Sequence, residues 1–182
     1  MEKQLNYPYE FDSKIVNDKP ACDLLIVTLK LDKDKQVDSL VKKLEMREGY
    51  PRRGDNVFDF YYNWKLIGRV AYTIVWKQVY LDRLIASNSL FDKDFLNSYR
   101  VNLFSEEIKQ LDKVKIPFLW TAVLMKFIKF LKTKAQAYEI LLTENWGKKL
   151  EDFYNNAFNF LKNKGIIIDG DLKKGVWKII LK

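Results

Sequence analysis

The sequence of 182 residues predicts an α+β protein, with a mixed but mostly antiparallel sheet flanked by helices. Runs of β-branched and aromatic residues over 57–86 are typical of strands that follow one another in hairpins. Apolar residues recur at helical spacing over 117–132 and 148–163. The segment 138–143 reads as a strand that follows a strand and a helix, and such a crossover pairs two strands in parallel. These observations together favour one mixed sheet with helices packed on it.

The N-terminal part begins with residues 1–20, which predict an irregular extension. The apolar run 24–29 (LLIVTL) predicts a buried strand. A helix is expected from about residue 34 to residue 47, because Val37, Leu40, Val41 and Leu44 have helical spacing and the first turn is acidic. Gly49-Tyr50-Pro51 then ends this helix.

The middle of the chain predicts three strands in an antiparallel meander, over 57–62, 66–76 and 79–86, with a turn at 63–65. Residues 87–115 mix aromatic and charged residues at roughly helical spacing. They predict one or two short helices, which form an insertion between the third strand and the next helix.

The C-terminal third begins with a helix from Pro117, a residue favoured in a first helical turn. Lys126, Lys129 and Lys132 form its narrow polar stripe, so we expect the remaining circumference to be buried. A helix over 148–163 follows the strand at 138–143, and Gly165 is expected to cap it. Strands over 166–168 and 176–181, joined by a turn at 169–171, complete a single domain over residues 1–182.

Composition excludes several kinds of chemistry. The chain has no histidine, which removes Ser-His-Asp and Cys-His nucleophiles and the usual zinc ligand sets, so we expect no metal. Cys22 is the one cysteine, so no intrachain disulfide can form. The N-terminus lacks the apolar segment of a signal peptide, and the longest apolar stretch, 116–125, is too short to span a bilayer. We therefore expect a cytoplasmic protein without a membrane partner.

Positive charge is concentrated in the last third of the chain. The net charge is +8, and residues 116–182 hold 12 Lys and Arg against 6 Asp and Glu. A basic surface attracts polyanions such as nucleic acid or a phosphorylated cofactor like coenzyme A. The simpler interpretation is a solvated, lysine-rich surface.

The order of elements over 57–182, with 24–47 as a first strand and helix, resembles that of the GNAT superfamily of N-acyltransferases. A short C-terminal motif has matching spacing, and its members are Ala157, Phe160, Leu161, Gly165 and Ile166. The resemblance implies a GNAT-like acyl-CoA N-acyltransferase fold with a helical insertion at 87–115. It also implies acetyl-CoA or another acyl-CoA as cofactor, and an amine acceptor.

The resemblance implies that acyl-CoA lies between two diverging strands, 79–86 and 138–143. Cofactor contacts are then expected from Leu84 and Ile85 in the first strand, from Asn145 after the second strand, and from Lys115, Trp120 and Thr121 around the start of the helix that begins at Pro117. The family's arginine and two glycines bind the diphosphate at that helix start. Here Lys115, Phe118 and Trp120 occupy those positions, so the glycines are absent.

Amine acylation needs a base for the amine proton and an acid for the leaving thiolate. We expect Asp82 as the base, Glu144 at the end of the second strand, and Tyr154 as the acid, because Leu161 occupies the position of the family's tyrosine. Each residue also has a structural interpretation. Asp82 would pair with Arg83 or Lys77, Glu144 and Asn145 would cap a helix, Tyr154 would be a core tyrosine, and Trp120 would anchor packing.

Two other functions remain open. The first is a non-catalytic protein whose basic last third binds nucleic acid or a protein partner. The second is a partner-binding domain whose interface is the aromatic insertion near Phe91–Phe104.

Overall fold

The computed structural model describes residues 32–51, 55–87, 107–143, 148–173 and 176–181. The chain divides into two units after Gln36, and only residues 32–36 of the first unit are described. The predicted strand over 24–29, the extension over 1–20 and most of the insertion over 87–115 therefore lie outside the described residues. A single domain over the whole chain stays a prediction.

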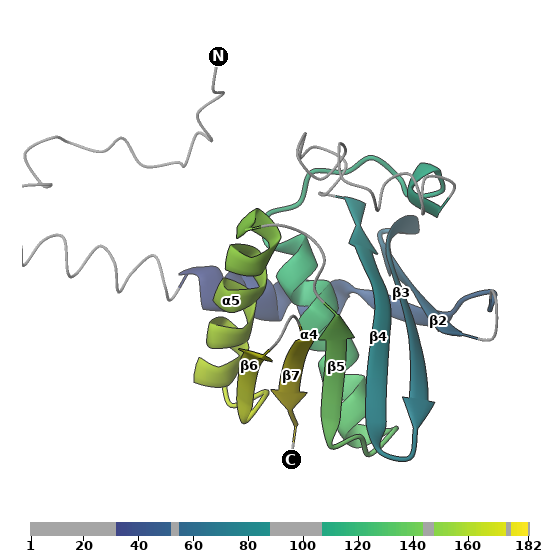
Figure 1. Cartoon of the computed structure of the whole chain (residues 1–182). Helices are drawn as coiled ribbons and strands as arrows, with labels where there is room; N and C mark the ends of the chain where they lie inside the picture. Colours follow the sequence, from purple (N-terminus) through teal and green to yellow (C-terminus); the bar gives the residue numbers. More distant parts are fainter. Residues whose placement is uncertain (1–31, 52–54, 88–106, 144–147, 174–175, 182) are drawn as a thin grey trace, which may run out of the picture. The chain divides into compact units, whose positions relative to one another are not determined.

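The sheet has seven strands in the order β1-β2-β3-β4-β5-β7-β6 (Figure 1). Its strands are β1 (Glu45–Glu48), β2 (Asn56–Tyr62), β3 (Lys65–Val75), β4 (Gln78–Ala86), β5 (Glu139–Thr143), β6 (Asp169–Lys173) and β7 (Val176–Ile180). Neighbouring strands pair antiparallel except β4 and β5, which are parallel. This confirms the predicted mixed, mostly antiparallel sheet.

The described helices are residues 32–43, a short turn at 107–109, α4 (Leu119–Thr133) and α5 (Lys148–Asn163). α4 begins two residues after Pro117, because Phe118 adopts a left-handed conformation with φ 57° that cannot continue into a helix. α5 ends as predicted. Gly165 has φ 68°, and the N–H groups of Gly165 and Ile166 bond the carbonyls of Lys162 and Leu161, each at 2.9 Å.

Two predicted elements are wrong. The first helix ends at residue 43 instead of residue 47, and Glu45–Glu48 form β1, which pairs with β2. The second error concerns the final hairpin, whose outer strand is β6, at the position where a turn was predicted. The apolar run 166–168 serves as a connection, because Ile166 completes the cap of α5 and Ile167 is buried in the core.

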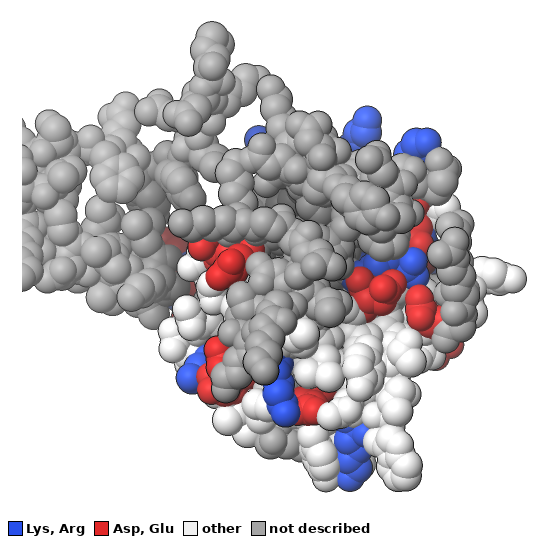
Figure 2. All heavy atoms as spheres, viewed as in Figure 1, with Lys and Arg blue, Asp and Glu red and all other residues white. Residues whose placement is uncertain are grey.

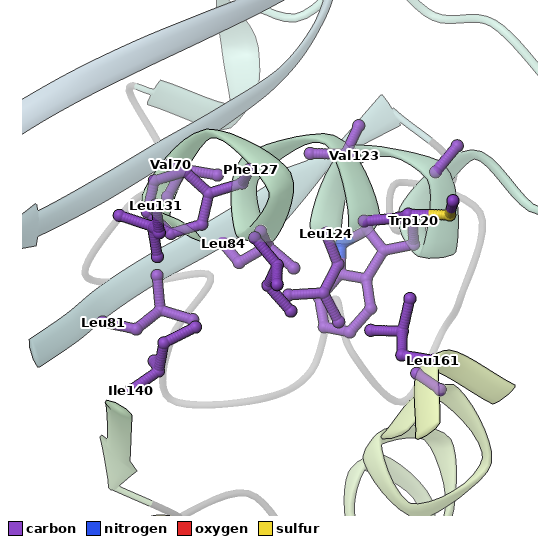
Figure 3. Close-up of a cluster of buried hydrophobic side chains, with 14 of the residues drawn as sticks. Val70, Leu81, Leu84, Trp120, Val123, Leu124, Phe127, Leu131, Ile140 and Leu161 are labelled. Carbon is purple, nitrogen blue, oxygen red and sulfur yellow. The ribbon is translucent and has the colours of Figure 1, made fainter. Parts of the chain in front are cut away.

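One apolar core lies between the sheet and the helices. It joins side chains from β2 to β5 and β7 with α4, α5 and the helical residues 37–41. α4 packs against β4, and α5 packs against β6. In Figure 3, Leu124 and Phe127 of α4 lie among Val70, Leu84 and Leu131. We call the side of the sheet that carries this core the helix face, and the other side the open face.

The lysine stripe of α4 is mostly not a solvated surface. Lys126 donates a hydrogen bond from Nζ to the Val41 carbonyl at 3.0 Å, and Lys132 donates one to the Ile166 carbonyl at 2.8 Å. Burial and the nearby Lys129 lower the pKa of Lys126. These two lysines of α4 thus satisfy backbone carbonyls at the ends of two other segments, the helix over 32–43 and the cap of α5. Two of the lysines predicted to face a polyanion therefore bind groups within the fold.

Candidate functional site

The parallel strands β4 and β5 are paired over only part of their length. Gln78, Val79 and Tyr80 of β4 lie opposite residues 139–141 of β5. Beyond Tyr80, β4 continues to Ala86 alongside β3, whereas the last two residues of β5 pair with β7. Figure 1 shows β4 running past the end of β5. Within the described residues, the ladder between β4 and β5 therefore ends at Tyr80 and Leu141, and the expected divergence of the two strands around acyl-CoA stays a prediction.

A β-bulge lies next to this point of separation. Arg83 pairs with Ala71 and Leu81 pairs with Tyr72, so Asp82 is the extra residue on β4. The bulge shifts the alternation of side chains. Leu81 and Leu84 both join the core of the helix face, while Ile85 packs on the open face with Ile108 and Leu111.

Asp82 projects from this bulge with 52% of its side chain exposed, and its Oδ2 lies 3.3 Å from Arg83 Nε. This contact confirms the structural interpretation of Asp82 as a partner of Arg83. The other proposed partner, Lys77, bonds the Tyr138 hydroxyl instead, at 2.8 Å. A role of Asp82 as base stays a prediction, and the exposed carboxylate has the access to solvent that such a role requires.

Charged side chains surround Arg83 on the open face. We call them the charged cluster, and its members are Asp55, Asp59, Arg69, Asp82, Arg83 and Glu107. Figure 2 shows acidic and basic groups in contact beside the upper part of β3 and β4. Sequence analysis did not identify Asp55, Asp59, Arg69 or Glu107. The available signal was a charge inside each of several apolar strands, such as Asp59 in VFDFYY and Arg69 in LIGRVAY.

One half of the charged cluster is a balanced pair. Arg69 binds Asp59 in a bidentate manner, Nε to Oδ1 at 2.6 Å and Nη2 to Oδ2 at 3.1 Å, and the two residues are register partners on β2 and β3. Arg69 also donates to Gln110 Oε1 at 2.9 Å. The hydrogen bond to Asp59 raises the pKa of Arg69 against the opposing effect of burial. This half thus pairs one guanidinium with one carboxylate through two hydrogen bonds.

The other half is centred on Arg83. Among the described residues, its guanidinium lies 3.3 Å from Asp55, 3.3 Å from Asp82 and 3.4 Å from Glu107. Glu107 is only 4% exposed. Its Oε2 is buried and has no hydrogen-bond partner in the structure.

The predicted phosphate-binding region is the start of α4. Lys115 is exposed, while Trp120 and Thr121 are buried in the first turn. No side chain caps this helix start, and its first turn contains no acidic residue. Its amide groups and the exposed Lys115 are the described features that would attract an anion there.

The aromatic side chains near α4 and α5 belong to the core. The Trp120 ring packs at a tilt against that of Tyr154, with ring centroids 5.3 Å apart. Tyr154 is 1% exposed and also packs on Phe158 at 5.5 Å and Trp177 at 6.4 Å. Figure 3 shows the Trp120 ring pointing from α4 into the core. The interpretations of Trp120 as a packing anchor and Tyr154 as a core tyrosine fit this geometry, and a contact of either side chain with substrate stays a prediction.

The remaining predicted site residues are Leu84, Ile85, Glu144 and Asn145. The side chains of Leu84 and Ile85 are each 1% exposed and point to opposite faces, so only main-chain groups of these residues could contact a cofactor, and that contact stays a prediction. Glu144 and Asn145 lie outside the described residues. The described residues contain no cluster of metal ligands, and none of the helices described is long and apolar enough to cross a membrane.

Comparison with known proteins gives no family assignment, because no protein-family model matches this chain and no curated protein matches its sequence.

Proposed function

We propose that this chain is a divergent GNAT-like N-acyltransferase, which transfers an acetyl or other acyl group from acyl-CoA to an amine acceptor. The observation that supports it most is the separation of β4 from β5 beyond Tyr80, next to the bulge at Asp82. A strand that lacks a neighbour on one side can pair its backbone with an extended ligand. The amide groups of the pantetheine arm suit that kind of recognition.

The predicted site residues then take the following roles. The main chain of Leu84 and Ile85 pairs with the pantetheine arm, and Lys115 with the first-turn amides of α4 attracts the diphosphate. Asp82, exposed on the bulge, takes the proton from the attacking amine, directly or through water. The acid for the thiolate is assigned to Tyr154, which must gain access from its buried position, and Glu144 and Asn145 act at the end of β5.

The absent glycines change how the diphosphate is held. Phe118 and Trp120 occupy their positions, and the side chain of Trp120 is buried in the core. A close backbone cradle around the phosphates is therefore replaced by the positive end of α4 and the charge of Lys115. We expect weaker binding that depends more strongly on salt.

Calorimetric titration with acetyl-CoA and with CoA tests this function. We expect saturable binding of both, weakened severalfold by Lys115→Ala. Lys113→Ala is the matched control, because Lys113 is also exposed and lies two residues earlier in the chain, farther in sequence from the start of α4. Asp82→Asn should retain binding and lose turnover of an amine acceptor. The absence of binding at millimolar acetyl-CoA would overturn the proposal.

A second candidate function is binding of single-stranded nucleic acid. It is favoured by exposed aromatic residues at the end of the sheet that carries the β3–β4 turn. Trp76 in the β3–β4 turn is 94% exposed, and Lys77 Nζ lies 4.4 Å above the half-exposed Tyr138 ring. Exposed aromatic rings beside a lysine are suited to stack bases and to contact phosphates.

Fluorescence anisotropy with a labelled oligo(dT) distinguishes this candidate from the first. The candidate predicts binding that weakens with salt and with Trp76→Ala, but not with Trp64→Ala, since Trp64 is 81% exposed in the β2–β3 turn. Binding that both variants reduce equally, or no binding, would exclude this surface.

A further inference from the structure

The short strand β1 lies at one edge of the sheet, and its sequence carries an inference about self-association. Among the described residues, β2 is the only strand that pairs with β1, and we call the opposite side of β1 the outer edge. The side chains of Glu45 and Arg47 are 51% and 48% exposed. A strand edge presents N–H and C=O groups in a row, so it is suited to pair with a further strand.

The register of β1 and β2 shows which backbone groups point to the outer edge. The Gly49 N–H bonds the Val57 carbonyl at 2.9 Å, and these two residues continue the β1–β2 register. Hydrogen-bonded and non-hydrogen-bonded pairs alternate along an antiparallel ladder, so Arg47 and Glu45 also bond β2 through their backbone. The backbone N–H and C=O groups of Met46 therefore point to the outer edge.

The side chains limit the registers in which a second copy of β1 could pair. Met46 packs on the core, whereas Arg47, the register partner of Asp59, lies on the open face with Glu45. An antiparallel pairing must keep each set of side chains on its own face, so the twofold axis of a symmetric pair passes through one residue of β1. An axis at Glu45, Arg47 or Glu48 places two like charges opposite each other, which is destabilising.

An axis at Met46 gives the opposite result. Glu45 of each copy then lies directly opposite Arg47 of the other copy, so two pairs of unlike charges form on the open face. Met46 exchanges backbone hydrogen bonds with Met46 of the second copy. The Arg47 guanidinium is already positioned on that face, because it lies 4.7 Å from the Tyr61 ring and 5.8 Å from the Trp64 ring. Among these registers, only the one centred on Met46 makes β1 complementary to itself.

We propose that this chain forms a symmetric dimer in which the β1 strands of two copies pair antiparallel about Met46 and join the two sheets. The same arrangement brings Tyr50, which follows β1 and is 86% exposed, to the end of the second copy that carries the 81% exposed Trp64. β1 has only 4 residues, so the interface is small and the dimer dissociates on dilution. This inference does not rest on the proposed acyl transfer.

Sedimentation equilibrium of the full-length chain, from micromolar to millimolar concentration, tests the dimer. We expect an apparent mass that rises with concentration from that of one chain towards that of two. Arg47→Glu and Glu45→Arg should each raise the dissociation constant at least about tenfold, because both pairs between the copies become repulsive. Asp152→Arg, a charge reversal at an exposed position of α5, should leave the dissociation constant unchanged. Far-UV circular dichroism checks that each variant is folded.

Two recoveries test the register. The double variant Glu45→Arg/Arg47→Glu exchanges the charges, restores both attractive pairs about Met46 and should dimerise like wild type. An equimolar mixture of the two single variants should also dimerise, since one copy is then acidic and the other basic at these positions. The proposal is overturned if the chain stays monomeric at millimolar concentration, if either single variant dimerises like wild type, or if the folded double variant stays monomeric.

Discussion

The two faces of the sheet around β4 differ in what they bury. On the helix face, Leu84 lies in a continuous apolar core with α4 and α5. On the open face, the adjacent Arg83 is 7% exposed and is surrounded by carboxylates. The ordinary alternation of side chains along β4, just after the bulge at Asp82, places these two adjacent residues in the two environments.

The difference separates residues that stabilise the fold from residues that are candidates for function. Apolar burial contributes about 25 cal/mol per Å² and explains the helix face without further assumptions. A buried group of charges is different, because well-packed apolar residues in its place are often equally or more stable. The contribution of the charged cluster to stability is therefore harder to predict than that of the apolar core.

The largest effect is expected on the helix face, from Trp177→Ala. Trp177 is 1% exposed and packs on Phe158 at 5.1 Å, so its removal leaves a large cavity. We expect the free energy of unfolding to fall by about 4 kcal/mol, measured by urea denaturation. Trp177→Phe should cost much less, because it fills part of the space and removes a buried indole N–H that has no acceptor.

Trp76→Ala is the matched control on an exposed tryptophan, with an expected change within about 0.5 kcal/mol. Equal losses for Trp76→Ala and Trp177→Ala would contradict the distinction between an apolar core and an exposed turn.

A smaller effect is expected on the open face, from Arg83→Met. This change leaves Glu107 buried without its cation, and we expect a loss of about 3 kcal/mol in urea denaturation. Glu107→Gln added to Arg83→Met should recover much of that loss, because it removes the isolated charge. A double variant as unstable as Arg83→Met alone would show that Arg83 acts through packing and not through charge compensation.

The apolar half of the fold was predictable from the sequence. Periodicity placed α4, α5 and the meander β2–β4 to within a few residues, because one side of each element is consistently apolar. Gly165 was identified as a C-cap because the left-handed conformation favours glycine. These features are local, and a local pattern is enough to predict them.

The errors and omissions arose from long-range contacts. β1 was hidden because Glu45–Glu48 (EMRE) carries no strand pattern and is ordered by pairing with β2. β6 was missed for a different reason: its sequence DGDLK resembles a turn, although its partner β7 begins only three residues after it ends. The charged cluster joins Asp55 and Glu107, which lie 52 positions apart, through Arg83, and no local spacing relates them. Asp82 was selected as a site residue from the resemblance. Its position on a β-bulge could be recognised only from the register of β3 and β4, which the sequence does not show.

The smallest effect is expected at the paired end of β4 and β5, where Glu139 lies on the open face. Lys178 Nζ contacts Glu139 Oε2 at 2.8 Å, and Gln78 also donates to Glu139. The hydrogen bond from Lys178, and then that from Gln78, lower the pKa of Glu139 from its usual 4.5 against the opposing effect of burial. Since the folded protein binds this proton more weakly than the unfolded chain, the resulting stabilisation is present above pH 4.5 and is lost as the pH falls through the lowered pKa.

Glu139→Gln should therefore flatten the acid side of the stability curve, measured as the free energy of unfolding in urea between pH 6 and pH 3. The change at pH 6 should be less than about 1 kcal/mol, because Lys178 is half-exposed and the pair is screened by solvent. Lys178→Met should reproduce most of the flattening, as the larger cause of the shift is removed. If both variants keep the wild-type dependence of the free energy of unfolding on pH, Glu139 does not contribute to that dependence. The open-face charges that affect stability would then be those around Arg83.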